Sequence, residues 1–179
     1  TASAKPVRQE IPTAPMTVAA GALTFGLASA QAEELNAKQP SLLTIGTGYF
    51  DLNVGNEKNP SWVFDVSYVP DYELVWGFRP LVGAFVNTDG GLYGHVGFSR
   101  AVFLTDNFST RFQVGFGLYE EGDSKDLGQA FEFREQVEIG YNFPSGHYLA
   151  AYFWHLSNAG IADDNPGVNS AGVTYSMPF

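Results

Sequence analysis

The chain contains no cysteine, which excludes disulfides and any chemistry that needs a thiolate. Basic residues are also scarce: the chain has 9 lysines and arginines and 19 aspartates and glutamates, which gives a formal net charge of −10. Such a chain lacks the basic surface that nucleic acid requires, so nucleic acid is not expected as a partner. A membrane is not excluded, because only the loops and the lumen of a transmembrane barrel carry charge.

No helix long enough to span a bilayer is indicated at the N-terminus. The apolar run over 16–28 (MTVAAGALTFGLA) falls short of the roughly 20 residues that a spanning helix needs. It follows Lys5 and Arg8 and precedes Ala30-Gln31-Ala32, which is the layout of a secretory signal peptide. The sequence therefore predicts a targeting segment over 1–32, cleaved after Ala32, and one domain over 33–179. A flexible tail or a tag remnant is the alternative.

In the remainder of the chain, large apolar residues recur at every second position. Trp62, Phe64 and Val66 alternate with smaller or polar residues, and the same alternation recurs along the chain. Eight strands are predicted, over 42–51, 61–69, 73–86, 91–104, 110–120, 129–143, 146–158 and 168–179.

The two faces of these strands differ in a way that indicates the kind of barrel. One face is large and aromatic, in a chain with 15% aromatic residues, and the other carries glycine and polar residues. An eight-stranded barrel has a lumen that barely holds its own side chains, so the aromatic face is expected outside, against lipid. The prediction is an all-β, eight-stranded antiparallel transmembrane barrel in an outer membrane. A soluble ligand-binding barrel is the alternative fold reading.

The connections between the predicted strands give an orientation. Short connections at 70–71, 105–107 and 144–146 alternate with mostly longer ones at 53–60, 87–91, 121–128 and 159–167. Outer-membrane barrels have short periplasmic turns and longer outer loops. The strand over 146–158 then runs outward, and its last residues reach the level of the outer leaflet.

A base and a nucleophile lie near that outer end, in the stretch His155-Leu156-Ser157-Asn158-Ala159-Gly160. Residues i and i+2 of a strand point to the same face, so the imidazole of His155 and the hydroxyl of Ser157 are expected side by side. This is the first requirement of a serine hydrolase.

Together with Asn165 and Gly167, these residues resemble the lipid A 3-O-deacylase family, the PagL-like outer-membrane hydrolases. The resemblance is close over the last two strands. It implies hydrolysis of an acyl ester of lipid A in the outer membrane, with no cofactor or metal, by a Ser-His-acid triad facing the lipid. Ser157 would be the nucleophile and His155 the base. Asn158 or the Gly160 amide would bind the oxyanion, and Asn165 would brace the loop.

One position departs from the family pattern. The family's acidic residue lies 12 places after the serine, and here that position is Asn169. Asparagine can orient a histidine but cannot supply the charge of a carboxylate, and it can stabilise the wrong tautomer.

Glu135 is a candidate replacement for the missing acid. If 144–146 forms a three-residue turn, Phe143 pairs with His147 and Glu135 faces His155 across neighbouring strands. A two-residue turn would move the partner to Leu156.

The alternative function is a catalytically silent outer-membrane barrel with a structural or interaction role, and Asn169 is the feature in its favour. The expected partners are lipid A or lipopolysaccharide as substrate and outer-membrane lipid around the barrel, and a homodimer is left open. Asp163 and Asp164 are expected to be solvated loop charges, with divalent ions bridging lipopolysaccharide as the alternative. The substrate's acyl chains are expected against the outer wall near Phe153 and Trp154.

Overall fold

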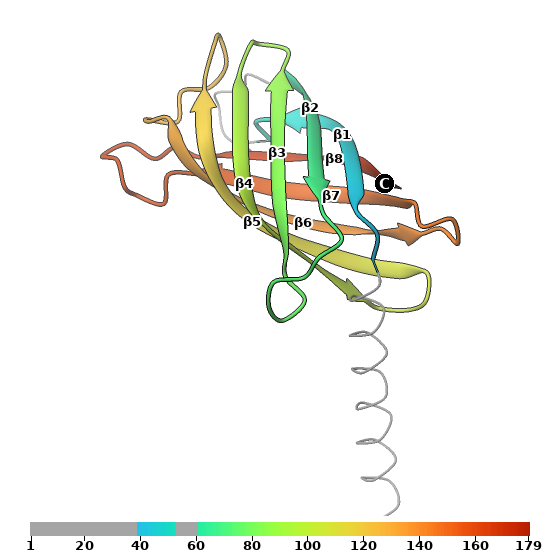
Figure 1. The fold of residues 1–179 in the computed structure, drawn as a ribbon. Coiled ribbons are helices and arrows are strands. Elements are labelled where there is room, and N and C mark those ends of the chain that lie inside the picture. Colours follow the sequence, from blue (N-terminus) through green and yellow to red (C-terminus); the bar gives the residue numbers. More distant parts are fainter. Residues whose placement is uncertain (1–38, 53–60) are drawn as a thin grey trace, which may run out of the picture.

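The computed structural model describes residues 39–52 and 61–179, which form a closed antiparallel barrel of eight strands, each paired with its neighbours in sequence order (Figure 1). The predicted targeting segment over 1–32 lies outside the described residues. The last strand closes on the first, with Leu42 paired to Pro178. The strands are β1 (Leu42–Phe50), β2 (Ser61–Val69), β3 (Arg79–Asn87), β4 (Leu92–Phe103), β5 (Phe108–Glu120), β6 (Phe131–Asn142), β7 (Tyr148–Ser157) and β8 (Val168–Pro178).

The predicted number of strands and their order are confirmed, but the start of β3 was wrong. The sequence predicted a strand from residue 73, whereas β3 begins at Arg79. Trp76 and Gly77 both have positive φ angles, of 54° and 78°, and these reverse the chain in a small hairpin. Leu74 N donates to Phe78 O at 2.8 Å to close it. The connection after β2 is therefore not a two-residue turn, although its alternating apolar residues imitate a strand.

The outer wall of the barrel is apolar, as predicted. Large apolar side chains on this face are exposed along the strands, and Ile45, Phe64, Val96, Phe112 and Phe153 are each 46–54% exposed. These are the side chains that an outer-membrane barrel turns toward lipid.

The lumen differs from the prediction at one end. Glycine and polar side chains were expected to fill it, but a buried aromatic cluster occupies the end near the longer loops. Phe85 stacks on Trp154 with ring centroids 5.3 Å apart, and Phe50 contacts Trp154, Phe85 and Tyr119. Alternation places these rings inside. Gly48 and Gly83 leave room beside them for the inward side chains of Tyr152 and His95.

The middle of the lumen is polar, as predicted. Arg134 donates to Asp65 at 2.7 Å and to Gln136 at 2.6 Å, and it contacts His95 at 3.2 Å. Gln136 in turn donates to Glu138 at 2.7 Å. Buried charges need such partners, so this network ties β2, β4 and β6 together across the lumen. Over the described ranges, no helix has the length and apolarity to cross a membrane.

Candidate functional site

His155 and Ser157 lie on the outer face of β7, close to its end. Burial alternates along the strand, with Trp154 and Leu156 fully buried inside and Phe153 46% exposed outside. His155 and Ser157 share the outward face with Phe153 but are only partly exposed. The two groups therefore face the lipid side of the wall and not the lumen, as the i, i+2 spacing predicts.

Asn169 holds the imidazole of His155. The two residues are paired between β7 and β8, and His155 Nδ1 lies 2.8 Å from Asn169 Oδ1. A carbonyl oxygen can only accept, so the hydrogen is on Nδ1 and the lone pair is on Nε2. That is the tautomer a general base requires, so Asn169 gives the correct orientation while supplying no negative charge.

Glu135 has the predicted position in the sheet. Phe143 N donates to His147 O at 2.9 Å, which closes a three-residue turn, and Glu135 pairs with His155. The Glu135 side chain is exposed on the outer face. Within the described part of the chain the ion pairs are Lys125–Asp51 and Arg134–Asp65, so Glu135 is not in direct ionic contact with the imidazole. Glu135 is therefore the cross-strand neighbour of His155, but the hydrogen bond of His155 Nδ1 goes to Asn169.

Asn158, directly after Ser157, organises the loop between β7 and β8. Its buried side chain donates from Nδ2 to Leu127 O at 3.1 Å and to Asp164 O at 2.8 Å. Its Oδ1 accepts from Gly160 N at 3.0 Å, and its backbone N donates to Asn165 Oδ1 at 3.1 Å. These bonds fasten the loop over 158–167 to itself and to the neighbouring loop over 121–130.

This bonding corrects the expected oxyanion donors. Both Nδ2 hydrogens of Asn158 are used, and the Gly160 amide donates to Asn158, so neither group is free for an oxyanion. They support the loop instead. Asn165 is exposed, and its Oδ1 is anchored by Asn158 N. Its Nδ2 has no partner in the described structure and remains available to a ligand.

Gly167 contacts the imidazole, a role that the sequence did not reveal. It has a φ of +55°, and a Cβ built on it would lie 3.0 Å from His155 Cε1 and 3.4 Å from Nε2. The absent side chain therefore lets the loop close against the ring. The sequence signal was the Asn-Pro-Gly turn, but a turn motif alone does not say which side chain it will touch.

The aromatic residues around the site divide between the two faces of the wall. Phe153 lies outside, whereas Trp154 is fully buried in the aromatic cluster, so the expectation that Trp154 lines the acyl chains was wrong. Trp154 instead points into the lumen, on the face of β7 opposite His155, and stacks on Phe85. Among the described residues, no group of three or more histidine, cysteine or acidic side chains is arranged to hold a metal ion.

A family model described as lipid A 3-O-deacylase (PagL) matches residues 47–178. The lipid A deacylase PagL of Bordetella bronchiseptica is 24% identical over 122 residues, which cover 68% of this chain and 54% of that protein. The PagL of Pseudomonas aeruginosa is 25% identical over 81 residues, covering 43% and 47%. The chain thus spans about half the length of these curated relatives.

Solved structures agree on the fold. A crystal structure of the outer membrane enzyme PagL aligns with a TM-score of 0.57 at 17% identity, covering 77% of this chain and 99% of that one. A de novo designed transmembrane β-barrel aligns with a TM-score of 0.52 at 10% identity, covering 78% and 97%. At these identities the alignments show the architecture alone, that of a transmembrane β-barrel.

Proposed function

The chain belongs to the lipid A 3-O-deacylase (PagL) family and forms an outer-membrane β-barrel, and we propose that it removes the 3-O-linked acyl chain of lipid A with Ser157 and His155. The observation that carries the proposal is the outward position of both side chains on β7. A lipid ester can reach this face of the wall without entering the lumen.

The reaction is an acyl transfer in two steps. Ser157 Oγ attacks the ester carbonyl while His155 Nε2 takes the hydroxyl proton. The bond from the acyl carbon to the sugar oxygen then breaks, and Nε2 returns the proton to that oxygen. Water attacks the acyl-serine in the same way, which releases a fatty acid and restores Ser157. No cofactor enters this sequence.

The hydrogen bond from His155 Nδ1 to Asn169 prepares Nε2 for this role. It orients the ring but leaves the imidazolium less stabilised than a carboxylate would. Glu135, on the paired strand, supplies a negative charge on the same face at a cross-strand spacing of about 5 Å. Near lipid, where screening is weak, that charge stabilises the imidazolium through its field and without a hydrogen bond.

The developing oxyanion needs a donor, and Asn165 is the group that the loop leaves available. Its Oδ1 is fixed by Asn158 N, which points the remaining Nδ2 hydrogens in a defined direction. A single oxyanion donor is typically worth about 10²–10³ in turnover. Asn158 and Gly160 contribute by holding the loop in place.

Mass spectrometry of lipid A tests the proposal. The purified barrel in detergent is incubated with hexa-acylated lipid A, and loss of one 3-hydroxyacyl group is expected. Ser157→Ala should abolish the loss, and Ser67→Ala, which removes a buried lumen hydroxyl, should preserve it. Loss of a chain from a different position would overturn the proposed regiochemistry.

The alternative is a silent barrel that has kept the family fold. Asn169 favours it, because an acid-to-amide change in a serine protease triad costs about 10⁴ in turnover. Unchanged lipid A after prolonged incubation with the folded protein would decide for this alternative.

A further inference from the structure

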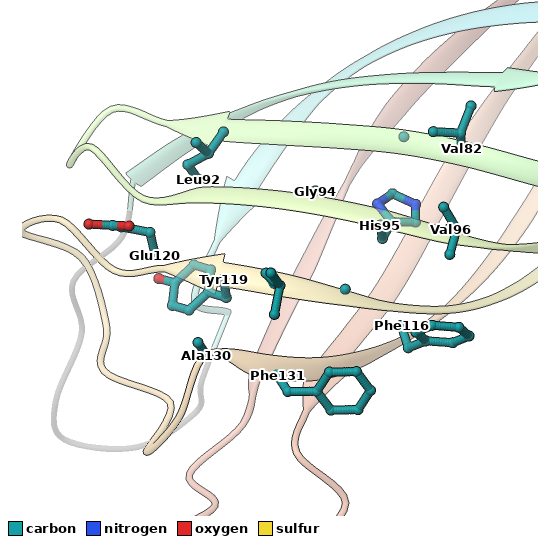
Figure 2. A pocket seen from close by; sticks show the side chains of 13 residues that line it. Val82, Leu92, Gly94, His95, Val96, Phe116, Tyr119, Glu120, Ala130 and Phe131 are labelled. Carbon is teal, nitrogen blue, oxygen red and sulfur yellow. The ribbon is translucent and has the colours of Figure 1, made fainter.

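A groove of about 760 Å³ lies in the outer wall, beginning on β6, the strand next to that of Ser157 (Figure 2). It crosses β3, β4, β5 and the start of β6. Six of its 13 lining residues are outward-facing apolar side chains, namely Val82, Leu92, Val96, Phe116, Leu118 and Phe131. Inward-facing positions of the same strands, His95 and Tyr119 among them, also border it. One acidic side chain, Glu120, lies at its edge on the side of the long loops.

The groove exists because Gly94 interrupts the apolar face of β4. Gly94 occupies an outward position between Leu92 and Val96, and a Cβ built on it would meet nothing within 4 Å. Its cross-strand partners are Ala84 on β3 and Leu118 on β5, so a very small side chain also borders it on one side. The gap is therefore a feature of the sequence at two paired positions.

Cross-strand pairing connects the groove to the proposed nucleophile. Ser157 pairs with Phe133, Phe133 with Phe116, and Phe116 with Val96. Strands lie about 4.8 Å apart, so Phe116 lies about 10 Å from Ser157 along the wall. Phe131 contacts both phenylalanines, with ring centroids 6.0 Å from Phe116 and 5.2 Å from Phe133. An unbroken aromatic surface thus leads from Ser157 to the groove.

We propose that this groove binds a second acyl chain of the lipid A molecule whose ester lies at Ser157. The inference rests on the proposed function. Lipid A carries several acyl chains on one disaccharide, so a molecule bound by one chain at β7 must lay the others along the neighbouring wall. The wall is already a lipid-facing surface, and the groove is the place where its shape admits a chain between side chains.

The expected energetic effect is moderate. A chain that leaves the bilayer for the groove moves from one apolar environment to another, so the gain comes from packing and not from the hydrophobic effect. The groove then selects and orients lipid A, and filling it should raise KM more than it lowers kcat.

The test is Gly94→Phe, which fills the groove from an outward position with open space around it. Its control is Ile45→Phe on β1, an outward position that is 51% exposed and outside the groove. We expect Gly94→Phe to raise KM for lipid A by about threefold or more, with Ile45→Phe unchanged. Hydrolysis of a short-chain p-nitrophenyl ester, which has no second chain, should be equal in both variants. Equal KM values for lipid A in the two variants would overturn the proposal.

A binding measurement separates this inference from the proposed activity. In a Ser157→Ala background, native mass spectrometry should show that the barrel retains lipid A in preference to phosphatidylethanolamine. Adding Gly94→Phe should remove the preference, and adding Ile45→Phe should keep it. Loss of the preference with Gly94→Phe would support the groove even if the unmodified barrel proves inactive. If the Ser157→Ala protein retains lipid A and phosphatidylethanolamine equally, the groove does not select lipid A and the proposal is overturned.

Discussion

The two faces of β7 differ sharply although their residues alternate along one strand. The inner face carries Trp154 and Leu156, which are fully buried in the aromatic cluster of the lumen. The outer face carries Ser157 and His155, both only partly exposed, and the His155 ring lies against Asn169 and Gly167. Under the proposed function, the close packing of β7 is thus on the face opposite the one that binds substrate.

This division has a physical reason. A side chain that exchanges protons with a ligand must be within reach of that ligand, so at least one side of it has to stay free of close protein packing. Because Trp154 points inward and His155 outward, β7 packs against the aromatic cluster without using His155 or Ser157 for that packing. Substitutions on the two faces should therefore affect different measurements.

The largest difference between the two faces is expected from Ser157→Ala, which should affect turnover, and Trp154→Ala, which should affect stability. Ser157→Ala is expected to lower turnover of lipid A by about four orders of magnitude or more. It should leave the denaturation midpoint of the barrel unchanged, because the hydroxyl is on the outer face. Trp154→Ala should lower the free energy of unfolding by about 3–5 kcal/mol, since it empties a large buried volume. Turnover by mass spectrometry and guanidinium unfolding by circular dichroism measure the two. Equal loss of stability in both variants would contradict the division.

Asn169→Glu should change activity and not stability, because it alters only the outer face of the wall. A carboxylate beside His155 Nδ1 stabilises the imidazolium, so kcat is expected to rise by about tenfold or more, with a ceiling of about 10⁴. Asn169→Gln is the matched control, because it lengthens the side chain without adding charge. If Glu135 already does this work, Asn169→Glu will change little and Glu135→Gln will be the harmful substitution. No effect from either would reject our account of how His155 is held.

Gly167→Ala should reduce activity by about tenfold, because its Cβ would press on the imidazole and move Nε2 away from Ser157. Gly160→Ala is the control, since Gly160 also has a positive φ, of 74°, but a Cβ there meets nothing within 4 Å. The two variants share the backbone strain and differ in the contact with His155. Single-turnover rates should fall for Gly167→Ala well below those for Gly160→Ala, and similar rates would show that backbone strain alone matters.

Ala159→Gly should have the smallest effect. Ala159 has a φ of 55°, and Ile161 N donates to Asn158 O at 3.1 Å across the turn it occupies. Glycine removes the left-handed strain of alanine, so the free energy of unfolding should rise by up to about 1 kcal/mol. Lipid A turnover should stay within about twofold, because the loop is held by Asn158 and not by Ala159. A drop in stability on this substitution would mean that the strain has been misjudged.

Most of the fold could be predicted from the period of two. Alternation identified all eight strands, and the short and long connections gave the end at which Ser157 lies. Alternation is misleading at 73–78, where apolar residues alternate but Trp76 and Gly77 have positive φ angles. It also failed for the lumen, because alternation assigns a residue to a face but does not say how the inward rings of Phe50, Phe85 and Trp154 will pack together.

The candidate site was predictable in part for the same reason. The shared face of His155 and Ser157 follows from their spacing, and the position of Glu135 follows from the length of one turn. Other contacts of the site join loops whose paths no local sequence pattern specifies. These are the hydrogen bonds of Asn158 to Leu127 and Asp164, and the contact of Gly167 with the imidazole.

The order of the amino acids was enough to predict a barrel with an apolar exterior and a histidine and a serine that share its outer face. Both follow from side-chain direction, which the pleat of a strand fixes residue by residue. The bonds that hold the loop after Ser157, and the groove that borders Gly94, come from the folded barrel. These depend on which strands and loops become neighbours when the barrel closes.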